Sequence, residues 1–176
     1  MNIKNIDDMK NYKIFTVLFL MFTISFWSCI DHPIDEDGLL ITDRTDCYVG
    51  SFDLLNTDNA SIIVGTNTVD TLEQVIIVYT RYGQPVDCLW PRFSLCSDAK
   101  LTPKVSGWTD FSGSKMNIDY VSGDWSSAGA VQAQLTERIL ANRSLFPSTA
   151  LKYSVISGNR KIKKEYTILI VERPLR

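Results

Sequence analysis

The sequence predicts an all-β fold, a β-sandwich of about seven short strands with one α-helix inserted late in the chain. Three observations lead to this class. Short runs rich in β-branched and aromatic residues recur from residue 47 onward, and clusters of Asn, Asp, Ser and Gly separate them. Near the C-terminus, apolar and polar residues alternate in two consecutive runs. One later segment instead repeats its apolar residues every fourth position.

The strongest strand signal is the apolar run VIIVYT, whose unbroken character predicts burial on both faces of a sheet. The two C-terminal runs form a hairpin around Gly158 and Asn159, with alternate residues facing a core. Pro91 cannot donate a ladder hydrogen bond, so its strand is expected at an edge or a bend. The expected strands are residues 47–55, 61–64, 72–80, 89–95, 100–105, 151–156 and 162–171, and residues 65–70 are expected to form a turn.

Residues 128–143 are the exception to the β pattern. Val131, Leu135 and Ile139 recur at intervals of four, which places them on one face of a helix. We therefore expect one amphipathic α-helix, carried by an insertion at about residues 114–149 between two strands.

Residues 1–28 have the pattern of a lipoprotein signal peptide. Basic residues precede an apolar run at residues 14–27, which is shorter than the roughly 20 residues that a membrane-spanning helix needs. Ser28 directly precedes Cys29, as in the cleavage box of bacterial lipoproteins. Cys29 is thus the predicted lipidation site, and its acyl chains would hold the mature protein on a membrane without a spanning helix. An uncleaved signal anchor, with Cys29 uninvolved, is the alternative.

The segment that follows Cys29 is acidic and predicts a flexible tether at residues 29–45, before a folded domain at residues 46–172. The tether resembles that of surface-exposed lipoproteins in Bacteroidota. We therefore expect the mature protein to be lipid-anchored in the outer membrane and exposed at the cell surface. The acidic residues concerned are Asp31, Asp35, Glu36 and Asp37.

The composition excludes several classes of protein. The formal net charge is -2, which lacks the basic footprint that nucleic-acid binding requires. The chain has one histidine, so histidine catalysis and multi-histidine metal sites are not expected. It contains no phosphate-binding loop, no serine-nucleophile motif and no carboxylate pair in an acid–base context. We expect no enzyme activity, no catalytic residue, no metal site and no cofactor.

Three cysteines follow Cys29. An oxidising compartment permits one disulfide among them and leaves one thiol. Cys88 and Cys96 flank a strand-length segment, which holds them too far apart to bond unless the chain bends there. Cys47 could reach either of them across a sheet. Buried free thiols that pack as small hydrophobic groups are the alternative.

The order of these features resembles a family of immunoglobulin-like domains of uncharacterised function. Three stretches carry the resemblance: VIIVYTRYGQPVDCLWP, LTPKVSGWTDFSG and LKYSVISGNRKIKKEYTILIV. The family occurs in outer-membrane lipoproteins of Bacteroidota, often encoded beside glycan-uptake systems of the starch-utilisation type. The resemblance implies an immunoglobulin-like sandwich and an accessory role in polysaccharide uptake. The resemblance implies no catalytic residues, and residues 114–149 have no counterpart in the family.

Three tryptophans are the candidate ligand-binding residues, because aromatic rings offer flat apolar surface to the C–H faces of sugars and binding residues concentrate near loops. They are Trp90, Trp108 and Trp125. The alternative is that each of them packs against the core.

The predicted function is that of an accessory glycan-binding component, whose partners are a glycan or outer-membrane uptake proteins. The alternative function is a structural spacer or a protein-docking module. In that case exposure of Leu135 and Ile139 would make the helix the docking element.

Overall fold

The computed structural model describes residues 33–118 and 128–173, which fall into two units divided after Leu40. In the first unit the chain closes a small turn. The amide of Asp35 donates to the carbonyl oxygen of Leu39 at 2.9 Å. Oδ1 of Asp35 accepts from the amides of Asp37 and Leu39 at 3.0 and 2.9 Å. The predicted lipidation site, Cys29, lies outside the described residues.

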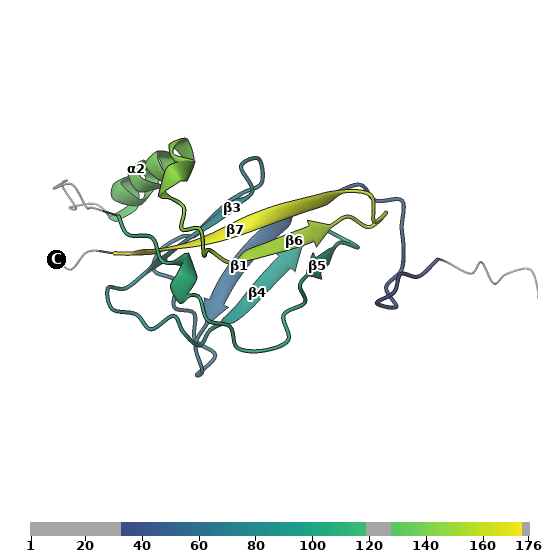
Figure 1. Cartoon of the computed structure of the whole chain (residues 1–176), viewed down its shortest axis with the longest axis horizontal. Coiled ribbons are helices and arrows are strands. Elements are labelled where there is room, and N and C mark those ends of the chain that lie inside the picture. The colour runs from purple at the N-terminus through teal and green to yellow at the C-terminus, as the bar shows by residue number, and fades with distance from the viewer. Residues whose placement is uncertain (1–32, 119–127, 174–176) are drawn as a thin grey trace, which may run out of the picture. The chain divides into compact units, whose positions relative to one another are not determined.

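The second unit contains two β-sheets and one α-helix (Figure 1). The smaller sheet pairs β1 (Val49–Leu55) with β4 (Trp90–Leu95), antiparallel. The larger sheet has the order β2-β3-β7-β6-β5, in which only β3 and β7 are parallel. Its strands are β2 (Thr68–Asp70), β3 (Val75–Thr80), β5 (Lys100–Thr102), β6 (Lys152–Ile156) and β7 (Lys163–Glu172).

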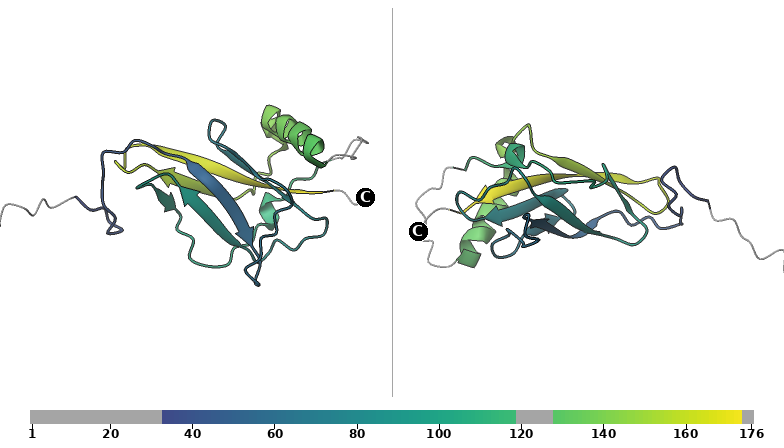
Figure 2. Two further views of the ribbon diagram at one scale, coloured as in Figure 1. Left: turned by 180° about the vertical axis from the view of Figure 1, so that it is seen from behind. Right: turned by 90° about the horizontal axis from the view of Figure 1, so that it is seen from below.

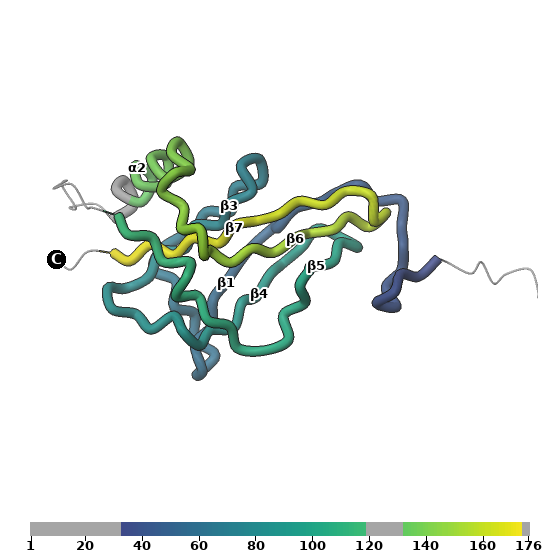
Figure 3. The backbone as a smooth tube through the Cα atoms, in the orientation of Figure 1, coloured from purple at the N-terminus to yellow at the C-terminus, as the bar shows by residue number. Residues whose placement is uncertain are grey.

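The helix is α2 (Ala128–Ala141), and short 3-10 helices lie at Ser112–Ser114 and Arg143–Leu145. The chain passes from β1 in the smaller sheet to β2 and β3 in the larger sheet (Figure 3). It then returns to β4 in the smaller sheet and crosses again to β5 in the larger one. This arrangement confirms the predicted all-β sandwich with a single inserted helix.

The main core lies between the two sheets. Along β6 and β7 the inward residues alternate as predicted, because successive side chains of a strand point to opposite faces. The same alternation along β1 sends Phe52 and Leu54 inward from the smaller sheet. The buried residues that the larger sheet contributes are Ile76, Val78, Tyr153, Val155, Tyr166, Ile168 and Ile170.

A second core lies on the other face of the larger sheet, where α2 covers it (Figure 2). Ile139 is 1% exposed, and Leu135 packs partly buried against the same cluster. β3 is therefore buried on both faces, as its sequence predicts. β7 was expected to be half-buried, but Leu169 and Val171 are also buried because they lie in this second core.

Two local predictions are wrong. Residues 61–64 form no strand, and only a single bridge joins Ser61 to Leu55. The expected turn at residues 65–70 contains β2, and the chain reverses at residues 71–74 instead. The cause is Asp70, whose Oδ1 accepts from the amides of Leu72 and Glu73 at 2.9 and 2.8 Å.

The start of the second unit is hydrogen-bonded to the β6–β7 loop. The amide of Thr42 donates to the carbonyl oxygen of Gly158 at 3.0 Å, and the amide of Asn159 donates to the carbonyl oxygen of Arg44 at 2.9 Å. Nε of Arg44 also lies 3.0 Å from Oδ2 of Asp98. This part of the predicted tether thus contacts the sandwich.

Candidate functional site

Trp90 and Trp108 lie side by side at the end of β4. Leu89 and Thr109 form an antiparallel bridge, exchanging two backbone hydrogen bonds of 3.0 and 2.8 Å. Trp90 directly follows Leu89 and Trp108 directly precedes Thr109. In an antiparallel pair these two residues are opposite each other, so their side chains lie next to one another. Their ring centroids are 5.7 Å apart and the rings meet edge to face at 76°.

Trp108 is 47% exposed, whereas Trp90 is partly buried. Leu89 is buried in the main core, and the alternation of the strand sends Trp90 to the outer face, as the sequence analysis expected. The structure thus brings together two of the three candidate tryptophans. Trp125 lies outside the described residues.

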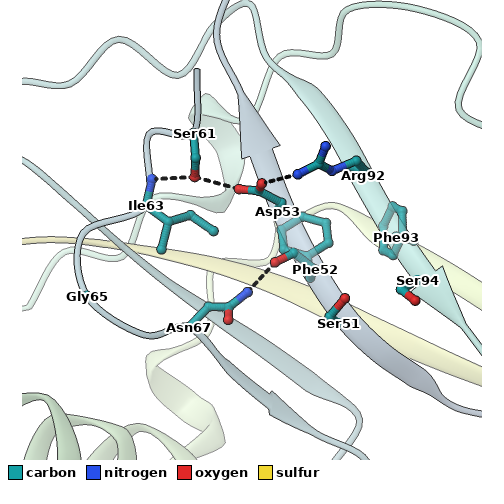
Figure 4. Close-up of a pocket in the computed structure, with 10 residues that line it drawn as sticks. All are labelled: Ser51, Phe52, Asp53, Ser61, Ile63, Gly65, Asn67, Arg92, Phe93 and Ser94. Carbon is teal, nitrogen blue, oxygen red and sulfur yellow. Dashed lines mark hydrogen bonds and ion pairs between the residues drawn. The ribbon is translucent and has the colours of Figure 1, made fainter. Parts of the chain in front are cut away.

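A groove runs along the outer face of the smaller sheet, next to Trp90. The antiparallel register places Leu55 opposite Trp90, Asp53 opposite Arg92 and Ser51 opposite Ser94. The loop at residues 61–67 forms the far wall, and the groove has a volume of about 500 Å³ (Figure 4). Its lining residues are Ser51, Phe52, Asp53, Ser61, Ile63, Gly65, Asn67, Arg92, Phe93 and Ser94.

An ion pair crosses the groove floor from strand to strand. Nη2 of Arg92 lies 2.7 Å from Oδ2 of Asp53, and the Ser61 hydroxyl donates to Oδ1 of Asp53 at 2.6 Å (Figure 4). The Asp53 side chain is 23% exposed and that of Arg92 is 64% exposed. The amide of Leu54 also donates to Oδ1 of Asp53 at 2.9 Å, so the carboxylate has three partners, while the guanidinium keeps most of its surface in solvent.

Other polar groups of the groove remain available to a ligand. The side-chain nitrogen of Asn67 donates to the carbonyl oxygen of Phe52, which directs the amide along the groove wall (Figure 4). Within residues 33–118 and 128–173, no donor to the side-chain oxygen of Asn67 is present, and the hydroxyls of Ser51 and Ser94 have no hydrogen-bond partner. Both serines are exposed.

Sequence reasoning missed this groove. The only available signal was that Asp53 and Arg92 occupy outward positions of two predicted strands. Their pairing depends on the register of β1 against β4, which joins residues 39 apart in the sequence.

The remaining ionisable side chains form no metal-ligating cluster in the described part of the chain. No group of three or more His, Cys, Asp or Glu residues there could hold a metal ion. Asp110 has a lowered pKa because the hydroxyl and the amide of Ser112 both donate to its carboxylate, which is an ordinary turn contact.

The three described cysteines are free thiols. Cys47 and Cys96 are buried and Cys88 is exposed. Burial raises the pKa of Cys47, so its thiol stays protonated and packs as a small hydrophobic group. No helix found within residues 33–118 and 128–173 has the length and apolar character to cross a membrane.

Comparison with known proteins gives only distant structural likenesses. No family model matches the chain, and no curated protein matches it. One similar structure is a Bacteroides thetaiotaomicron protein provisionally described as a glycoside hydrolase, with 16% identity, a TM-score of 0.35 and coverage of 76% of this chain. This chain spans 26% of that protein.

Two further structures are similar at the same level. A Bacteroides fragilis protein provisionally described as secreted has 11% identity and a TM-score of 0.40, over 73% of this chain and 97% of that one. A DUF4623 family protein from Bacteroides eggerthii has 16% identity and a TM-score of 0.40, over 74% of this chain and 22% of that one. The chain therefore spans about a quarter of the length of the first and third neighbours.

Proposed function

We propose that this protein is a non-catalytic cell-surface lipoprotein that binds glycan through Trp90 and Trp108, as an accessory component of an outer-membrane polysaccharide uptake system. The observation that carries the proposal is the tryptophan pair, because Trp108 keeps 47% of its surface exposed beside a second large ring. A Trp ring offers wide apolar area at little cost in side-chain entropy, and an exposed pair is suited to the C–H face of a sugar.

The angle between the rings decides what shape they offer. At 76° the rings of Trp90 and Trp108 meet edge to face, so they do not form one flat platform. A sugar ring therefore stacks on one ring face at a time, and the groove along β4 supplies polar groups for its hydroxyls.

Docking of a partner protein through the helix is the competing function. It needs an exposed apolar face on α2. Ile139 is 1% exposed and Leu135 packs against the larger sheet, so these two side chains are used within the domain itself. Their burial favours the helix as a cover for the sheet.

The glycan-binding test compares Trp108→Ala and Trp90→Ala with the native protein on a panel of neutral oligosaccharides. Each variant is expected to lose affinity by about fivefold or more, since a lost aromatic contact is worth about 1 kcal/mol or more. Tyr82→Ala is the matched control, because Tyr82 is 59% exposed and lies outside the groove lining. Unchanged binding by both Trp variants, or no glycan binding by the native protein, would contradict the proposal.

The membrane anchor belongs to the same proposal and has its own test. Acylation of Cys29 as the first residue of the mature chain would keep an immunoglobulin-like domain at the membrane surface. Mass spectrometry of the N-terminal peptide from membrane fractions is expected to show an acylated Cys29. An intact leader without acyl groups would refute the anchor and leave the glycan test unaffected.

A further inference from the structure

We infer that the glycan site extends from the tryptophan pair into the groove, and that it takes a run of several sugar residues of a neutral oligosaccharide rather than a single sugar. This inference rests on the proposed glycan-binding function. It assigns a role to the groove residues and names the class of ligand.

Three side chains of β4 are aligned from the tryptophan pair into the groove. Trp90, Arg92 and Ser94 are alternate residues of one strand and therefore point to the same face. From Trp90 to Ser94 the strand covers about 13 Å, at about 3.3 Å per residue. A single sugar ring does not reach over this distance, whereas a short chain of sugars does.

The groove supplies hydrogen-bonding groups for the hydroxyls of a sugar chain. Arg92 has one nitrogen in contact with Asp53, and its other N–H groups have no described partner. The Ser51 and Ser94 hydroxyls and the side-chain oxygen of Asn67 are likewise uncommitted among the described residues. The groove thus offers both donors and acceptors, as the hydroxyl groups of sugars require.

The side chains that line the groove carry no net charge. The Asp53 carboxylate and the Arg92 guanidinium are the only ionised side chains in the groove lining, and they neutralise each other at 2.7 Å. A site of zero net charge gives no general attraction to acidic polysaccharides. The groove therefore favours a neutral chain.

The far wall of the groove is held in place by contacts with β3 and α2. The amide of Val64 donates to the carbonyl oxygen of Tyr79 at 2.8 Å, and Nε2 of Gln132 donates to the carbonyl oxygen of Val64 at 3.0 Å. A Cβ atom at Gly65, where φ is +80°, would lie 2.9 Å from the Gln132 side chain. β3 and α2 thus fix this loop before a ligand arrives, which lowers the entropy cost of binding.

The test measures affinity against chain length by calorimetry. The probes are gluco-, manno- and xylo-oligosaccharides from monosaccharide to hexasaccharide, with oligogalacturonates as acidic probes. For the native protein, affinity for one neutral series is expected to rise by about tenfold or more between the monosaccharide and the longer chains.

Arg92→Leu is expected to remove most of this gain while leaving the weak binding of the shortest ligand unchanged. Arg143→Leu is the matched control, because Arg143 is similarly exposed and similarly paired, with Glu73, but is not a groove residue. Trp108→Ala is expected to weaken binding at every length.

The possible outcomes separate the two proposals. If Trp108→Ala abolishes binding but affinity is independent of length and Arg92→Leu changes nothing, the extended site is refuted and the glycan-binding function stands. A preference for the oligogalacturonates that declines with salt overturns the neutral ligand class. If the native protein binds none of the probes, both the function and the extended site fail.

Discussion

The hydroxyl group of Tyr79, on β3, lies 2.9 Å from Oγ1 of Thr136, on α2. The same hydroxyl lies 3.1 Å from the carbonyl oxygen of Gln132, so the helix and the larger sheet are hydrogen-bonded across the second core. Gln132 in turn contacts the loop that forms the far wall of the groove. One buried tyrosine therefore connects the helix cover to the candidate binding face.

Tyr79→Phe tests this connection. The substitution removes the hydrogen bonds of the hydroxyl with Oγ1 of Thr136 and with the carbonyl oxygen of Gln132, and we expect the free energy of unfolding to fall by about 1 kcal/mol. Urea unfolding followed by circular dichroism measures the change. Tyr82→Phe should stay within about 0.5 kcal/mol of the native protein, because Tyr82 is largely exposed. Equal effects of the two substitutions would refute the role of the Tyr79 hydroxyl.

Ile139→Ala tests whether α2 covers the sheet as part of the folded core. Ile139 is 1% exposed in the second core, so its truncation should cost about 2–5 kcal/mol of stability. Thermal and urea unfolding both report this loss. A negligible change would mean that α2 does not pack stably on β3 and β7.

Gly158→Ala tests the contact between the start of the second unit and the β6–β7 loop. A Cβ atom at Gly158 would lie 2.4 Å from Oγ1 of Thr42 and 3.1 Å from Cβ of Asp98. We expect a loss of about 1–3 kcal/mol, or displacement of Thr42 from the loop, which limited proteolysis near residue 42 would detect. Gly107→Ala is the control, since nothing lies within 4 Å of a Cβ atom there.

The stability of the domain should decline at alkaline pH. Burial raises the pKa of Tyr79 and of Tyr166 above the ordinary 10.0, and that of Cys47 above 9.0. The unfolded chain therefore loses these protons at a lower pH than the folded chain does. The contribution of these three groups to the free energy of unfolding is fully present below about pH 9 and is lost as the pH rises above that value.

Urea unfolding at a series of pH values between about 7 and 11 measures this decline. Tyr79→Phe should make the fall above about pH 10 shallower, since one raised pKa is removed. A free energy of unfolding that stays constant or rises over this pH range would contradict the raised pKa values of these three side chains.

The cysteines should differ in reactivity. Cys88 is exposed, whereas Cys47 and Cys96 are buried, and burial raises the pKa of Cys47. A thiol reagent followed by peptide mapping should label Cys88 in the folded protein, and label the other two only after denaturation. Rapid labelling of Cys47 under native conditions would contradict the predicted difference in reactivity.

The local pattern of residues was sufficient to predict every strand of the structure except β2, and the direction of the side chains along β6 and β7. The alternation of Tyr153, Val155, Tyr166 and Ile168 places all four in the main core, and the four-residue repeat predicts α2. The outward position of Trp90 follows from the same rule. Successive side chains of a strand point to opposite faces, and Trp90 directly follows the inward-pointing Leu89.

The sequence predicts that β6 and β7 pair as a hairpin, but only the tertiary structure decided which strands distant in the sequence are neighbours. The pairing of Asp53 with Arg92, the parallel contact of β3 with β7, and the meeting of Trp90 with Trp108 each depend on the packing of inward faces from distant parts of the chain. A register is selected by the whole core at once, and no local sequence signal reports it. The tryptophans could therefore be proposed as ligand-binding residues from the sequence, whereas the groove beside them could be found only in the folded domain.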